Sequence, residues 1–77
     1  MVCILVVEDD VQFNRIVCSY LADRGFNVVG CFSAAEALEE MEKISFDMIA
    51  SDIMMKNING FEFAEQVRAV NKDIPFL

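Results

Sequence analysis

Histidine is absent from this 77-residue chain, and basic residues are few. The lack of histidine excludes imidazole general bases and imidazole metal ligands. Six Lys and Arg stand against 13 Asp and Glu, which gives a formal net charge of −7. We therefore expect no direct binding of nucleic acid by this segment, because neutralising phosphates requires clustered Lys and Arg. Small cations are the more natural partners.

Long hydrophobic runs are also missing, although 56% of the residues are hydrophobic and the mean hydropathy is +0.41. The first apolar run stops at Glu8, well short of the roughly 20 residues that cross a membrane. The start of the chain shows no basic leader and no cleavage-site pattern. We expect no membrane span and a cytoplasmic location. The three cysteines show no metal-ligand spacing and are interpreted as small buried residues in a reducing compartment.

Strands and helices alternate in the pattern of apolar residues. Residues 2–7, 27–31 and 47–51 are predicted as strands, and residues 74–77 begin a fourth. A helix is expected in each gap, at about residues 11–24, 34–43 and 60–70. This order predicts one α/β domain with parallel strands and right-handed crossovers. The strongly apolar first strand suits the centre of a doubly wound sheet, so the expected strand order is 2-1-3.

The predicted helix ends carry capping residues. Asp9 or Asp10 caps the first helix, and Gly25 stands where a left-handed residue would end it. Ser33 begins a capping box before the second helix. Within the first helix, apolar residues gather on one side, and Asn14 falls on the opposite side with the polar residues.

Two of the apolar runs end on acids. Residues 2–7 are followed by Glu8, Asp9 and Asp10, and residues 47–51 are followed by Asp52. If the two strands are neighbours, these carboxylates converge at the topological switch point, where α/β folds bind ligands. Taken alone, Glu8, Asp9 and Asp10 are equally well explained as acids at a helix N-terminus, and Asp52 alone is better explained as a turn acid after a strand. Together they favour a site for a hard cation, and oxygen ligands without histidine suit Mg²⁺ better than Zn²⁺.

The sequence ILVVEDD at residues 4–10, with DIMM at residues 52–55 and Asn59-Gly60 behind it, resembles the receiver domain of two-component response regulators. The resemblance covers the whole chain, residues 1–77, and implies a flavodoxin-like fold. The chain matches only the first part of that domain. It is truncated after the third βα unit, with the start of strand 4 and without strand 5 and the last helices.

The resemblance also implies roles for individual residues. Asp52 corresponds to the phospho-accepting aspartate. Glu8 and Asp9 correspond to the acid pair that binds Mg²⁺ together with Asp52, and the backbone carbonyl of Met54 corresponds to the third protein ligand. Asp10 then corresponds to a helix-capping acid. The family usually has proline where this chain has Lys56, which removes a constraint on φ after Asp52.

The implied function is that of a signalling switch and not of an enzyme. The domain would accept a phosphoryl group from a sensor histidine kinase or phosphotransfer protein. The family's phosphate-binding Lys and its switch Ser or Thr belong to the part that this chain does not match. We therefore expect Mg²⁺ binding to survive better than phosphoryl transfer.

Two alternatives stay open. The chain could be a receiver fragment that acts only as a self-associating interaction module, through an exposed sheet edge that forms a homo-oligomer. A Mg²⁺-dependent phosphohydrolase or nucleotide-binding domain ranks behind it. That reading would require a DxD pair on one strand or a glycine-rich phosphate loop, and the sequence contains neither.

Overall fold

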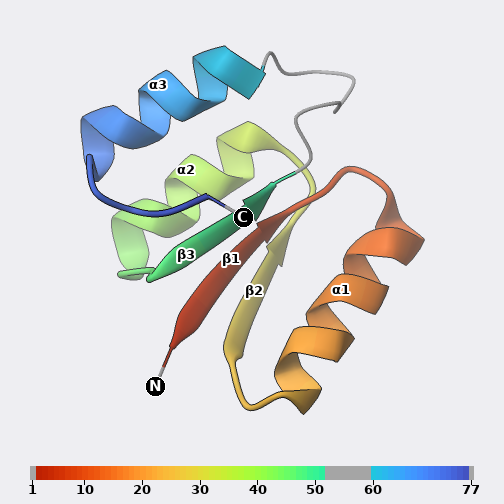
Figure 1. The fold of residues 1–77 in the computed structure, drawn as a ribbon. Helices are drawn as coiled ribbons and strands as arrows, with labels where there is room; N and C mark the ends of the chain where they lie inside the picture. Colours follow the sequence, from red (N-terminus) through yellow and green to blue (C-terminus); the bar gives the residue numbers. More distant parts are fainter. Residues whose placement is uncertain (1, 52–59, 77) are drawn as a thin grey trace.

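The computed structural model describes residues 2–51 and 60–76, with the backbone alone at positions 60 and 61. Six elements follow one another along the chain: β1 (Cys3–Val7), α1 (Val11–Asp23), β2 (Asn27–Cys31), α2 (Ala34–Lys43), β3 (Met48–Ser51) and α3 (Gly60–Val70). The three strands are parallel, in the order β2-β1-β3, with α1 on one side of the sheet and α2 and α3 on the other (Figure 1). This arrangement confirms the predicted α/β class, the strand order and the central position of the first strand.

The hydrophobic core lies between the sheet and the pair α2 and α3. Leu5 and Ile49 are fully buried on the strands, as are Ala37 on α2 and Val67 on α3, while Phe63 is 2% exposed. Burying a side chain of this size stabilises the fold by roughly 1.5–3 kcal/mol. The core therefore depends on both helices that cover this face.

The predicted fourth strand is present as a single pairing. Ile49 of β3 forms a parallel bridge with Phe76, and the Ile49 N–H donates to the carbonyl of Pro75 at 3.0 Å. The Phe76 ring meets the Phe63 ring edge-on, with centroids 6.2 Å apart. The segment that ends the described chain thus covers part of the outer edge of β3.

The helix caps form at the residues that the sequence indicates. Asp10 is the cap of α1, since its Oδ1 accepts the Phe13 N–H at 3.0 Å. Gly25 follows the other end of α1 with φ +93°, and its N–H donates to the carbonyl of Ala22 at 3.0 Å. A left-handed glycine in this position is typical of a helix C-terminus. Ser33 caps α2 by accepting the Glu36 N–H at 3.2 Å.

The buried side of α1 differs from the one that the apolar pattern marks. Asn14, predicted on the polar side, is 3% exposed, whereas Phe13, Ile16 and Tyr20 are 53%, 64% and 55% exposed. The prediction for Asn14 was therefore wrong. The physical reason is that α1 packs mainly against β2, where Gly30 leaves room for a polar side chain that finds hydrogen bonds there.

Candidate cation site at the carboxyl edge of the sheet

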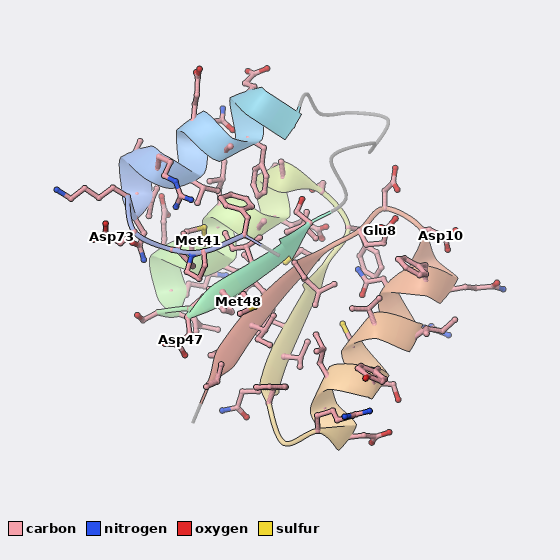
Figure 2. All side chains as sticks on the ribbon, viewed as in Figure 1. Glu8, Asp10, Met41, Asp47, Met48 and Asp73 are labelled. Carbon is pink, nitrogen blue, oxygen red and sulfur yellow. The ribbon has the colours of Figure 1, made fainter. Side chains whose placement is uncertain are left out.

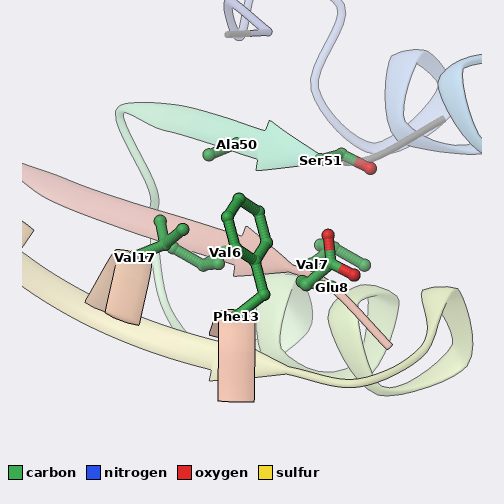
Figure 3. A pocket seen from close by; sticks show the side chains of 7 residues that line it. All are labelled: Val6, Val7, Glu8, Phe13, Val17, Ala50 and Ser51. Atoms are coloured by element: carbon green, nitrogen blue, oxygen red, sulfur yellow. The ribbon is translucent and has the colours of Figure 1, made fainter. Parts of the chain in front are cut away.

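A pocket opens where β1 and β3 end beside α1. Val7 of β1 is in register with Ser51 of β3, so the two strands end at the same level. The pocket has a volume of about 200 Å³ and is lined by Val6, Val7, Glu8, Phe13, Val17, Ala50 and Ser51. Figure 3 shows Glu8 and Ser51 at the same end of it, with the Phe13 ring beside them. Among the described residues that line it, the one ionisable group is the carboxylate of Glu8.

Glu8 is held by hydrogen bonds at its backbone and its side chain. Only 5% of the residue is exposed. Its N–H donates to the carbonyl of Cys31 at 3.0 Å, and its own carbonyl accepts the side-chain amide of Asn14 at 3.0 Å. Its Oε1 accepts the Asp10 N–H at 3.1 Å. The direction of this buried carboxylate is therefore set before any ligand arrives.

The other two acids of the turn differ in their surroundings. Asp9 is half-buried, whereas Asp10 is exposed and directs its carboxylate back to α1 as the helix cap (Figure 2). This division agrees with the interpretation of Asp10 as a capping acid. Glu8 and Asp9 are therefore the two acids of this turn for which the prediction of a cation ligand remains, and carboxylate oxygens are the ligands that Mg²⁺ prefers.

The remaining predicted ligands are not placed by the structure. Asp52 and Met54 lie outside the described residues, as do Lys56 and Asn59. Within residues 2–51 and 60–76, no three Asp, Glu, Cys or His side chains come together in a way that could hold a metal ion. The predicted site residues Asp52 and Met54, and the ligand roles of Glu8 and Asp9, thus remain predictions.

The thiols near this edge are poor competitors for a cation. All three cysteines are free. The pKa of the Cys31 thiol is raised to about 11, chiefly by burial and to a smaller extent by the charges of Glu36 and Glu40. Burial also raises the pKa of Cys18. Because metals bind the thiolate, protonated thiols leave carboxylates as the available donors at neutral pH.

Asn14 is the residue of this edge that the sequence did not reveal. Its amide donates to the carbonyl of Glu8, which directly follows β1, and to the carbonyl of Cys31, which ends β2. A strand glycine, Gly30, leaves room for this polar helix residue, but the sequence alone does not show which residue fills that room. Nothing in the chain pattern relates the two residues before the helix is docked on the sheet.

A parallel sheet in the order 2-1-3 with helices on both faces is the arrangement of doubly wound α/β domains, a class that binds its ligands at the switch point of the sheet. The profile of the family described as response regulator receiver domain matches residues 4–77, and the chain belongs to this family. No helix in the described parts of the chain is both long and apolar enough to cross a membrane.

Sequence similarity to regulatory proteins supports the assignment to the receiver-domain family. The chain is 38% identical over 69 residues to the probable transcriptional regulator ycf29 of Porphyra purpurea, over 90% of this chain and 33% of that protein. It is 34% identical over 74 residues to the transcriptional regulatory protein ZraR of Salmonella typhimurium, over 96% of this chain and 17% of that protein. The chain thus spans a third or less of the length of these curated relatives.

Solved structures match over almost the whole chain. Chemotaxis protein CheY4 of Vibrio cholerae superposes with a TM-score of 0.93 at 35% identity, over 99% of this chain and 65% of that one. The response regulator TrrA of Thermotoga maritima, solved with Mg²⁺ and BeF, gives 0.89 at 29% identity, over 99% and 66%. A second TrrA structure, in complex with the histidine kinase ThkA, gives 0.88 at 29% identity, over 99% and 66%.

Proposed function

We propose that this chain is part of a receiver domain in which Asp52 accepts a phosphoryl group from a phosphohistidine of a sensor kinase or phosphotransfer protein. In this proposal Mg²⁺ is bound by Glu8, Asp9, Asp52 and the backbone carbonyl of Met54. The observation that carries it is the buried, hydrogen-bonded carboxylate of Glu8. Glu8 and Asp52 are also the next residues in the chain after Val7 and Ser51, which are paired in the sheet.

The family and its relatives support the same chemistry. TrrA is a response regulator with solved structures that contain Mg²⁺ and BeF in one case and a histidine kinase in the other. Relatives are named transcriptional regulators, which agrees with the proposed regulatory role. The cation and the kinase are carried over to this chain as part of the proposal.

The transfer itself requires one bond to form and one to break. A carboxylate oxygen of Asp52 attacks the phosphorus of phosphohistidine and forms a P–O bond. The P–N bond breaks, and the leaving imidazole nitrogen takes the electron pair and then a proton. Bound Mg²⁺ would screen the charge of the phosphoryl oxygens. Glu8 and Asp9 contribute by holding two oxygen donors at a fixed edge, which lowers the cost of arranging them when the cation binds.

A Mg²⁺ titration followed by amide NMR shifts tests the site first. We expect localised shifts at Glu8 and Asp9 that weaken in the variant Asp52→Asn. Intact mass after treatment with acetyl phosphate and Mg²⁺ then tests the transfer, and we expect one added phosphoryl group that Asp52→Asn abolishes. If Mg²⁺ shifts no amide at this edge, the cation site is wrong. If Mg²⁺ binds and no phosphoryl group is added, the proposed acceptor role of this chain is wrong.

The alternative is a self-associating interaction module without phosphotransfer. Among the described residues, the outer edge of β3 is paired only at Ile49 with Phe76, and α1 exposes Phe13, Ile16 and Tyr20. Unpaired strand edges and exposed apolar side chains are typical of surfaces that meet another chain. Light scattering at protein concentrations of tens of micromolar distinguishes the two cases, since a sharply monomeric profile excludes association through this edge.

A further inference from the structure

The side chain of Asn14 connects α1 to the ends of two strands. Its Nδ2 donates to the carbonyl of Glu8 at 3.0 Å and to the carbonyl of Cys31 at 2.9 Å. Its Oδ1 accepts the thiol of Cys18, with Sγ at 3.4 Å. Both amide hydrogens and the amide oxygen are therefore used, in a place where the residue is 3% exposed.

Gly30 of β2 leaves the space that this amide occupies. A Cβ atom at position 30 would lie 2.6 Å from Oδ1 of Asn14 and 2.9 Å from Sγ of Cys18. Positive φ among the described glycines is confined to Gly25, so position 30 has a backbone that other residues adopt. Glycine is required there for room and not for conformation.

The amide bonds reach the backbone of a proposed cation ligand. The carbonyl of Cys31 already accepts the Glu8 N–H, and the Asn14 amide then holds both this carbonyl and the carbonyl of Glu8. On the other side of the turn, Oε1 of Glu8 accepts the Asp10 N–H. The turn from Glu8 to Asp10 is thus held at the Glu8 carbonyl by Asn14 and at the Asp10 N–H by the carboxylate of Glu8.

We infer that Asn14 is a positioning residue for the acidic turn, where it holds the Glu8 carbonyl so that the carboxylates of Glu8 and Asp9 are directed for a divalent cation. The inference rests on the proposed function, because it assigns the cation to this turn. Hydrogen-bond partners behind metal ligands fix ligand direction, and their loss typically weakens metal binding about 10- to 100-fold. Asn14 has this relation to Glu8 through the backbone.

Two variants and one matched control test this role. Asn14→Leu removes both N–H donors, and Gly30→Ala keeps every polar group but pushes the amide away. Cys18→Ala is the control, since it removes the contact to Oδ1 and leaves the two carbonyl bonds in place. We expect Mg²⁺ affinity, followed at the amides of Glu8 and Asp9, to fall about tenfold in both variants. The Mg²⁺ affinity of Cys18→Ala should stay within about twofold of that of the parent chain, although this variant also loses the packing contacts of the thiol.

A second readout needs no cation. The Asp10 N–H donates to Glu8, so its hydrogen exchange reports whether the turn is held. We expect exchange at Asp10 to be about tenfold faster in Asn14→Leu and Gly30→Ala than in Cys18→Ala, at a temperature where circular dichroism shows all of them folded.

The outcomes separate the two proposals. If the parent chain shows no Mg²⁺ shifts, the proposed function fails, and Asp10 exchange alone decides whether Asn14 positions the turn. If exchange and Mg²⁺ affinity in both variants equal those of the control, the positioning role is wrong. If Asn14→Leu does not fold, Gly30→Ala gives the same decision.

Discussion

The effect of the substitution Gly30→Ala on the free energy of unfolding tests how α1 packs on the sheet. The added Cβ would lie 2.6 Å from Oδ1 of Asn14, well inside van der Waals contact. In an allowed backbone, replacing glycine by alanine normally stabilises by about 0.4–1 kcal/mol through the unfolded chain. Whether Gly30→Ala raises or lowers the free energy of unfolding therefore depends on whether Asn14 can move without losing its hydrogen bonds.

Asn14 is poorly able to move, because its amide is bonded to two buried carbonyls. If the amide stays in place, overpacking typically costs about 1–3 kcal/mol; if the amide moves away instead, a buried carbonyl left without its donor costs about the same. After the gain from alanine is subtracted, we expect Gly30→Ala to lower the free energy of unfolding by about 1–2 kcal/mol. For a domain of this size that is a fall in Tm of roughly 4–16 °C.

Urea unfolding followed by circular dichroism measures this change, and the variant Asn14→Ala supplies the matched background. Once the amide is removed, only the contact of the new Cβ with Sγ of Cys18 at 2.9 Å remains, so Gly30→Ala should cost clearly less and the two substitutions should be coupled in a double-mutant cycle. An increase in stability in the parent chain would refute the reasoning. So would an equal cost in both backgrounds, since the cost would then not come from Asn14.

Two further predictions concern a helix cap and a buried thiol. Asp10→Ala should lower the free energy of unfolding by about 1 kcal/mol, because the Phe13 N–H loses its acceptor. Asp10→Asn keeps a side-chain oxygen and should retain most of the stability. Equal losses in the two variants would argue against the cap. The pKa of Cys31 is raised from 9.0 to about 11, chiefly by burial, so the folded state holds its proton more tightly than the unfolded state. This contribution is complete below pH 9 and is lost as the pH rises towards 11. Urea unfolding between pH 8 and 11 should therefore show a decline that is smaller in Cys31→Ala, and identical pH profiles would contradict this.

Much of the fold follows from the sequence because its signals are local. Alternating apolar and helical stretches predict the elements, and the caps at Asp10, Gly25 and Ser33 involve partners within five residues. The strand order follows because the most apolar strand must be covered on both faces. The acids after the first strand could be recognised as a candidate site because the carboxyl ends of parallel strands meet at one edge of the sheet.

The tertiary structure alone decided which side of α1 is buried and how Glu8 is held. The apolar residues of α1 form a pattern, but the pattern does not say which surface the sheet offers. That surface contains Gly30, and the space above it accepts the amide of Asn14, which reaches a carbonyl 17 residues away in the chain. Contacts of this kind exist only after the crossover has placed the helix on the sheet. The sequence by itself therefore determined the elements, their order and the acids, whereas the packing determined the residue that orients those acids.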